Sequence, residues 1–170
     1  MSRPAARIGD AVVHILPPVL TGTPGSQDVI IGGAPAWRGI SAAQLAQLLK
    51  AMKEAAKEIK KAETASKLAE GSSAAPAAKA NEKKVKAEQA KKLAELMASF
   101  MPADLHLCAM FIPPPVHGAG VVIEGSQTVL INGQPACRAQ DLILESNIAA
   151  NIPPIDNRIK SGHPTVLIGG

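Results

Sequence analysis

Short runs of β-branched and aliphatic residues, each followed by a turn, recur along the chain and predict brief strands. Val-Ile-Ile at residues 29–31 precedes Gly32-Gly33, and Val-Leu-Ile at residues 129–131 precedes Asn132-Gly133. Both turns are built from residues that tolerate positive φ, as two-residue β-hairpin loops require. Val-Leu-Ile returns at residues 166–168, before two further glycines. The pattern therefore predicts three copies of one small β unit.

A second phrase, Pro-Ala-X-Arg, also occurs three times, at residues 4–7, 35–38 and 135–138. An aspartate follows the first and last of its arginines by three residues. After the middle arginine, the corresponding aspartate is delayed until Asp104. Internal repetition builds a fold from copies of one supersecondary unit. We therefore expect the three copies to pack about a pseudo-threefold axis, with an insertion in the middle copy.

The inserted segment, residues 41–101, has a different composition, rich in the helix formers Ala, Lys, Glu and Leu. Ser41 and Gln44 form a capping-box pattern at its start, and Gly-Ser-Ser-Ala-Ala-Pro at residues 71–76 breaks it in the middle. Pro102 ends the second half. We predict a helical hairpin inserted into a mainly β domain. The resulting division of the chain is residues 1–40 and 102–170 for the β part and residues 41–101 for the hairpin.

Apolar residues fall at helical spacing along one stripe of each predicted helix. The stripe is expected to pack mostly between the two helices, and the alternative is that it docks a helix of another protein. Its predicted members are Leu45, Leu48, Leu49, Met52 and Ile59 in the first helix and Val85, Leu93, Leu96, Met97 and Phe100 in the second.

The formal charge of +4 comes from the insertion, where twelve Lys face seven Glu; the rest of the chain has six basic and seven acidic residues. Glutamates interleave with the lysines, and aromatic side chains for base stacking are scarce, so we expect no nucleic-acid partner. Neither a secretory signal nor an apolar run of transmembrane length is visible. We expect the protein to fold in the cytoplasm and to leave it only with another machine.

Imidazole and thiol groups gather in one short stretch of the chain. His106 and Cys108 lie two residues apart, so on an extended segment their side chains point the same way. Prolines at residues 113–115 stiffen the return to His117. Nitrogen and sulfur donors suit tetrahedral Zn²⁺, and His14 is the candidate fourth ligand. We predict one structural zinc ion, while the second cysteine of the chain is expected to be a buried thiol.

Taken together, these phrases resemble the PAAR-repeat proteins, the spike-tip proteins of contractile injection machines, above all of type VI secretion. The resemblance covers residues 1–38 and 103–170. It implies a small cone of three β-hairpin units, bound as a monomer to the end of a trimeric VgrG-like spike. It also implies one zinc ion near the apex, held by His14, His106, Cys108 and His117. The cap would sharpen the spike, meet the target membrane only transiently during injection and be exported at the tip.

Three features depart from the family pattern. Residues 142–146, after the third aspartate, lack the cysteine that family members often carry, and a serine is usual where His163 stands, so we expect His163 to be a turn residue. The helical insertion is not part of the common core and could recruit an effector or a chaperone. The alternatives are a zinc-dependent hydrolase, disfavoured because four ligands would leave no place for water, and a free-standing zinc adaptor that binds partners through the helices.

Overall fold

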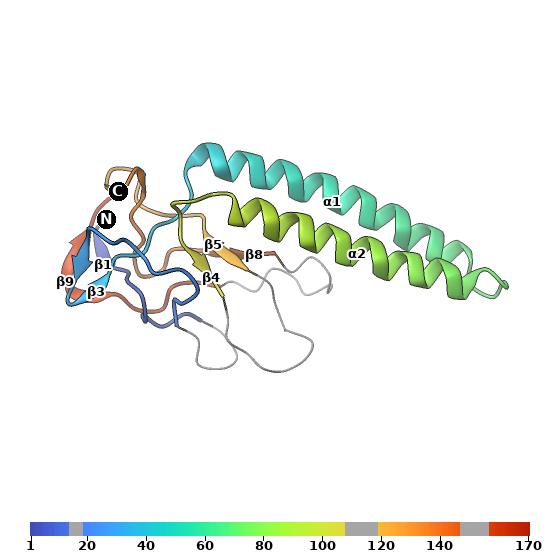
Figure 1. Cartoon of the computed structure of the whole chain (residues 1–170), viewed down its shortest axis with the longest axis horizontal. Helices are drawn as coiled ribbons and strands as arrows, with labels where there is room; N and C mark the ends of the chain where they lie inside the picture. The colour runs from blue at the N-terminus through green and yellow to red at the C-terminus, as the bar shows by residue number, and fades with distance from the viewer. Residues whose placement is uncertain (14–18, 108–118, 147–156) are drawn as a thin grey trace.

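The computed structural model describes residues 1–13, 19–107, 119–146 and 157–170. These residues form two long helices and several small antiparallel sheets (Figure 1). The helices are α1 (Ala42–Leu68) and α2 (Ala75–Ala98). The strands are β1 (Arg3–Ala5), β2 (Ile30–Ile31), β3 (Ala34–Pro35), β4 (Leu105–His106), β5 (Gly120–Val122), β6 (Leu130–Ile131), β7 (Gln134–Pro135), β8 (Ile143–Glu145) and β9 (His163–Ile168).

The fold class is mixed α and β rather than mainly β, which corrects the expectation from the sequence. The helices hold 27 and 24 residues, whereas no described strand exceeds six. The predicted β units are present, but apart from the six-residue β9 their strands have only two or three residues. Helical residues of the insertion therefore outnumber strand residues within the described part of the chain.

The copies at residues 29–38 and 129–138 form the β-hairpins predicted from their turns. In β2–β3, Gly32 and Gly33 have φ of 55° and 82°, and in β6–β7, Asn132 and Gly133 have φ of 53° and 77°. Two successive residues at positive φ match the right-handed twist of the flanking strands. The register is the same in both hairpins, because Ile30 pairs with Pro35 and Leu130 pairs with Pro135.

The remaining copy is divided between the first and last strands, β1 and β9. Strand β9 pairs with β1, so that Leu167 lies opposite Pro4 and Ile168 opposite Arg3. The equivalent pairs of β6–β7 are Leu130 opposite Pro135 and Ile131 opposite Gln134. The last strand motif and the first Pro-Ala-X-Arg phrase, which are far apart in sequence, therefore complete one hairpin. We call these three hairpins, β1–β9, β2–β3 and β6–β7, the β body.

Closed rings of backbone hydrogen bonds join the three copies of the β body. The Ala6 N–H donates to the Cys137 carbonyl (2.9 Å), the Cys137 N–H to the Trp37 carbonyl (3.0 Å) and the Trp37 N–H to the Ala6 carbonyl (3.0 Å). These residues hold the X position of the three phrases. A ring of this kind requires each copy to contact both of the others in the same way, which is a pseudo-threefold arrangement.

The core of the β body follows the same symmetry. One buried cluster takes from each copy the last apolar residue of the strand and the alanine of the phrase: Ala5, Ile31, Ala36, Ile131, Ala136 and Ile168. A second cluster contains the three ring residues, of which Trp37 is the largest and fully buried. Small residues at the other two ring positions leave space for this indole, so one large side chain fills the centre that three copies share.

The helical hairpin begins with the predicted capping box. The Ser41 side chain accepts from the Gln44 N–H, and the Gln44 side chain accepts from the Ser41 N–H (2.8 Å). The two helices run antiparallel and bury Leu48, Ala55, Ile59 and Ala62 of α1 against Leu93 and Met97 of α2. The apolar stripe therefore packs mainly between the helices, as expected, except at Leu49, which is 52 % exposed.

The base of the helical hairpin shares a buried cluster with the sheet β4–β5–β8. Leu48 and Met97 of the helices and Val121 of β5 belong to it, and Ile40 and Phe100 close it where the chain enters and leaves the insertion. Figure 1 shows the helices extending from this junction along the long axis, with the α1–α2 turn farthest from both termini. A search of the described residues finds no helix that is long and apolar enough to cross a membrane.

Candidate functional site

The arginine and aspartate of each repeat copy form a clamp that fixes the chain after the phrase. Asp104 accepts from the Arg38 backbone N–H, Nε and Nη2, each at 2.9 Å. The same backbone and Nε contacts join Arg7 to Asp10 and Arg138 to Asp141. Arg38 and Asp104 are 66 residues apart in sequence, yet Asp104 takes the place of the aspartate that follows the other two arginines, which confirms that it is the delayed aspartate of the repeat.

Each arginine also reaches the turn of a neighbouring hairpin. Arg7 Nη1 donates to the Gly32 carbonyl (3.2 Å), Arg38 Nη1 to Asn132 Oδ1 (3.3 Å), and Arg138 Nη1 to the carbonyls at Gly169 and Gly170. One guanidinium thus binds its own aspartate and the next copy at once. Because Arg38 and Arg138 are buried together with their carboxylates, these clamps couple the three copies tightly.

The residue that leads each strand motif makes a third cyclic set of contacts. Ser26 Oγ donates to Asn132 (2.8 Å), and Ser126 Oγ donates to the Gly169 carbonyl. His163 occupies the corresponding place in β9, and its ring lies so close to Gly32 that a Cβ there would be 2.2 Å from it. His163 therefore contacts the neighbouring turn, but it is the first residue of strand β9 and pairs with Ala5, so it is not the turn residue expected from the sequence.

Only one of the four predicted zinc ligands lies within the described residues. His106 stands in β4, is fully buried, and pairs with Gly120 of β5. His106 stands two residues after Asp104, and the equivalent positions after Asp10 and Asp141 are the buried Val12 and Ile143. His106 therefore occupies a core position that is aliphatic in the other two copies. An imidazole in that layer fits a ligand aimed into the interior. His14, Cys108 and His117 lie outside the described residues, which by themselves contain no group of three metal-binding side chains.

Two further buried titratable groups, Cys137 and Asp141, have raised pKa values. Cys137 is fully buried, as expected for the second cysteine, and burial raises the pKa of its thiol well above the usual range, with Asp141 and Asp104 acting in the same direction. Its thiol therefore stays protonated and serves as a small apolar core residue. Burial also raises the pKa of Asp141, although the guanidinium groups of Arg138 and Arg3 oppose this shift.

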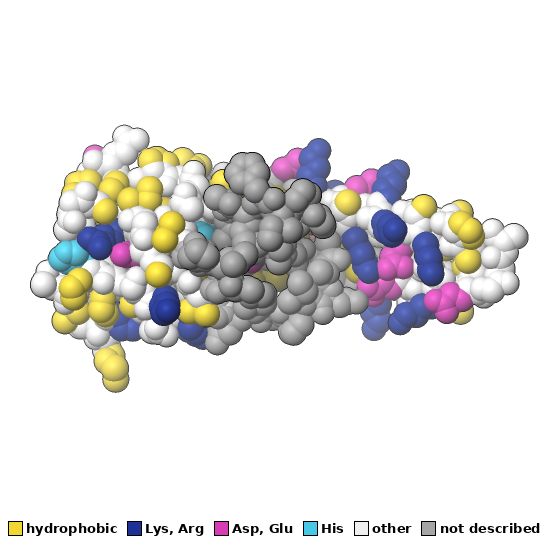
Figure 2. Space-filling model, turned by 90° about the horizontal axis from the view of Figure 1, so that it is seen from below, with side chains coloured by type: hydrophobic (Ala, Val, Ile, Leu, Met, Phe, Trp, Pro, Cys, Tyr) yellow, Lys and Arg dark blue, Asp and Glu magenta, His cyan; other side chains and the backbone are white. Residues whose placement is uncertain are grey.

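Three equivalent apolar side chains point outward from the β body. Ile30, Leu130 and Leu167 are 55 %, 60 % and 60 % exposed, and each lies opposite the proline of its phrase. We call them the apolar triad. Figure 2 shows hydrophobic side chains on the surface of the β body, at the left of the view. Since strand residues alternate between faces, the buried neighbours of the triad fill the core while the triad itself remains available to a partner.

The sequence reasoning did not identify the apolar triad as a functional feature. A signal was present, because Ile30 and Leu130 each stand five residues before the proline of their own phrase. The third member was hidden, since its proline, Pro4, lies at the other end of the sequence from Leu167. Arg3, which forms an ion pair with Asp141, was missed because no repeat phrase includes it.

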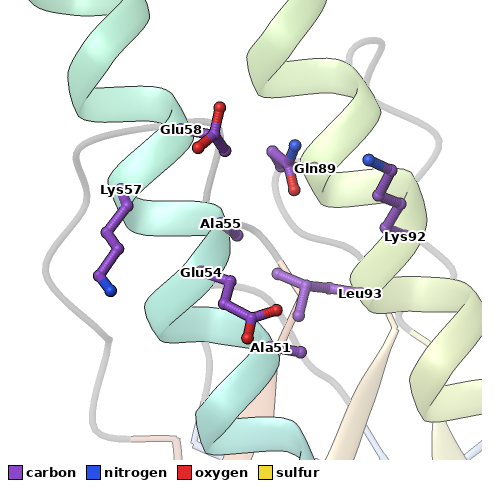
Figure 3. A pocket seen from close by; sticks show the side chains of 8 residues that line it. All are labelled: Ala51, Glu54, Ala55, Lys57, Glu58, Gln89, Lys92 and Leu93. Atoms are coloured by element: carbon purple, nitrogen blue, oxygen red, sulfur yellow. The ribbon is translucent and has the colours of Figure 1, made fainter.

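A shallow groove of about 400 Å³ runs between the helices, over two members of the cluster shared with the sheet (Figure 3). Ala55 and Leu93 form its apolar floor, and Glu58 and Gln89 stand at its rim. Figure 3 shows Lys57 pointing away from α2 on the outer side of α1. The charged rim and the narrow floor make this groove a poor site for a partner helix.

A scan of known families matches residues 113–170 to the PAAR motif, which is about a third of the chain. The matched segment contains β5 to β9. No curated protein and no solved structure matches the chain significantly.

Proposed function

From the PAAR motif domain at residues 113–170, the domain of the spike-tip proteins of type VI-like secretion systems, we propose that this chain caps a trimeric VgrG-like spike. In this proposal residues 1–38 and the matched segment together form a PAAR cone, and the β body is its wide part. One molecule of this chain sits on the end of the trimer. The cap sharpens the spike for puncture of a target membrane and is exported with it. The PAAR family is structural and non-enzymatic, so no catalytic role is proposed.

The observation that carries the proposal is the symmetry of the apolar triad. A single chain that presents the same exposed aliphatic group three times around one axis can contact three identical subunits equally. Exposed aliphatic groups that become buried in an interface contribute through the hydrophobic effect. The closed hydrogen-bond rings and the arginine clamps hold the three hairpins in fixed relation, so the display is preorganised and loses little conformational freedom on binding.

The proposal includes one structural zinc ion held by His14, His106, Cys108 and His117. PAAR proteins often bind such a metal, and the buried position of His106 supports its place in the set. Bound zinc would cross-link segments that leave the clamps of the first and middle copies, and thereby add folding free energy where the chain narrows. Recruitment of an effector or a chaperone by the helical hairpin stays a prediction.

Substitution of the apolar triad tests the spike interface. We expect Leu130→Glu or Leu167→Glu to weaken binding to a VgrG-like trimer by at least about thirtyfold, as removal of an interface hot spot does. Pull-down or biolayer interferometry with the purified trimer measures the effect. Leu68→Glu is the matched control, because Leu68 is 82 % exposed on the helical hairpin. Equal binding by the triad variants and wild type would contradict the proposed interface.

Metal analysis tests the zinc site. We expect Cys108→Ser to lower both the zinc content and the melting temperature, because a thiolate ligand is lost. Cys137→Ser is also expected to lower the melting temperature, because it buries a hydroxyl in the apolar core. It should keep the zinc. Native mass spectrometry reads the metal content of both variants. Full zinc occupancy in Cys108→Ser would show that the ligand set is wrong.

A further inference from the structure

The lysines of α1 gather on the helix face opposite its buried residues. Buried residues recur at Leu48, Ala55, Ile59, Ala62 and Ser66, whereas the lysines occupy the complementary positions. We call this surface the lysine face; it consists of Lys50, Lys53, Lys57, Lys60, Lys61 and Lys67, all exposed. At a rise of 1.5 Å per residue the face is about 25 Å long.

The lysine face carries little compensating negative charge. Lys61 pairs with Glu58 (2.7 Å), while the other five lysines have no ion pair within the part of the chain that the structure describes. The glutamates of α1 lie toward the flanks and the groove, as Glu54 and Glu58 do in Figure 3. Glutamates that interleave with lysines in the sequence are thus separated from most of them on the helix surface.

Helix α2 is different. Its outward lysines Lys84 and Lys91 stand four residues before a glutamate, with separations of 3.9 Å from Glu88 and 3.8 Å from Glu95. Lys86, at the seam between the helices, pairs with Glu63 of α1 (2.8 Å) and Glu82 of its own helix (2.6 Å). Each helix carries six lysines and three glutamates, so the helices differ in arrangement and not in net charge. Among the described residues, three lysines of α2 have an ion pair, against one of α1.

We propose that the lysine face binds the anionic surface of a lipid bilayer, with α1 lying along the phospholipid headgroups. A straight row of lysines suits a flat array of negative charge, since each lysine near such a surface contributes independently. An acidic protein partner would need an apolar centre to its interface, but the exposed leucines Leu49 and Leu68 stand at opposite ends of the face. Neither helix contains arginine or an exposed aromatic residue, the groups that favour nucleic acid.

The position of the helices leaves this face accessible. The α1–α2 turn is at the end of the molecule farthest from the termini and from β1 and β9 (Figure 1). A partner on the apolar triad of the β body would therefore not cover the outer half of α1. The inference concerns the insertion alone and does not depend on the proposed spike-tip role.

Vesicle co-sedimentation of the full chain tests the inference. We expect binding to vesicles of phosphatidylcholine mixed with phosphatidylglycerol, no binding to phosphatidylcholine alone, and release at high salt. The triple variant Lys53→Gln, Lys57→Gln and Lys60→Gln should partition about a hundredfold more weakly. The control is Lys83→Gln, Lys84→Gln and Lys91→Gln on α2, which removes the same charge and keeps helix propensity, and it should retain most of the binding.

Three outcomes would overturn the inference. The first is no binding of the wild type to anionic vesicles at low salt. The second is an equal loss in both triple variants, because net charge alone would then account for attraction. The third is tighter, lysine-face-dependent binding to a DNA duplex than to the vesicles, which would make nucleic acid the partner. Circular dichroism of each variant confirms that the helices are intact before binding is compared.

Discussion

Asp104→Ala is expected to destabilise the protein by about 3–5 kcal/mol, the cost of leaving one member of a buried ion pair without its partner. Asp104 is fully buried and holds the backbone and side chain of Arg38, which is itself only 7 % exposed. It also accepts a hydrogen bond from the Thr23 hydroxyl (2.8 Å). Loss of this carboxylate releases the middle copy of the repeat where the chain returns from the insertion.

The repeat supplies a matched control for this variant. Asp10 accepts from the backbone N–H and Nε of Arg7 as Asp104 does from Arg38, but the Arg7 side chain is 24 % exposed and can be solvated when the carboxylate is removed. Asp10→Ala should therefore cost only about 1–2 kcal/mol. Urea denaturation followed by circular dichroism gives both values. If Asp104→Ala does not fold, Asp104→Asn keeps the shape and one acceptor and should give an intermediate midpoint. Equal losses in the Asp104 and Asp10 variants would show that burial of the clamp does not matter.

Complete removal of residues 41–101 is expected to cost about 3–6 kcal/mol, even though the segment is an insertion in the repeat. The deletion exposes Ile40 and Val121, which are 3 % and 1 % exposed in the intact chain, and burial of each such side chain contributes about 1.5–3 kcal/mol. Leu105, Ile123 and Leu144 lose packing as well. The inserted hairpin is thus expected to contribute to the stability of the β part.

A shorter deletion separates the two parts of the helical hairpin. Removal of residues 60–84, with a glycine-rich turn between Ile59 and Val85, keeps Leu48, Leu93 and Met97 on the sheet. The free energy of unfolding of this variant should lie within about 1 kcal/mol of the wild-type value, because the deletion removes only helical turns that are exposed or that pack on each other. Thermal unfolding of both deletions measures the difference. A stable, unchanged β part after removal of all of residues 41–101 would show that the shared cluster is dispensable.

The sequence predicted the features of this fold that depend on local chemistry. Residue type and spacing predicted the positive-φ turns at Gly32-Gly33 and Asn132-Gly133 and the capping box at Ser41, and the structure confirms them. The repeat also predicted that Asp104 is the equivalent of Asp10 and Asp141, and its contacts with Arg38 confirm this. The threefold packing followed from repetition. Each of these signals is carried by a few neighbouring residues or by an exact phrase.

Features that depend on long-range contacts were not accessible from the sequence. The pairing of β9 with β1 joins opposite ends of the sequence, so no local pattern reveals the third hairpin or the third member of the apolar triad. Lysines and glutamates alternate along α1, and only the choice of buried face places the lysines together. The shared cluster at the base of the helices was missed because helical periodicity does not say which residues of a stripe contact a sheet. All four zinc ligands remain predictions, and three of them lie outside the described residues.

Native mass spectrometry of the full chain mixed with a VgrG-like trimer shows how many chains bind one spike. We expect a complex of one chain with three VgrG-like subunits, because the pseudo-threefold β body uses all three of its equivalent faces at once. The complex should be absent with Leu130→Glu and present with Leu68→Glu. A complex with three chains per trimer, or no complex at concentrations where both proteins are folded, would contradict the role of this chain as a spike tip.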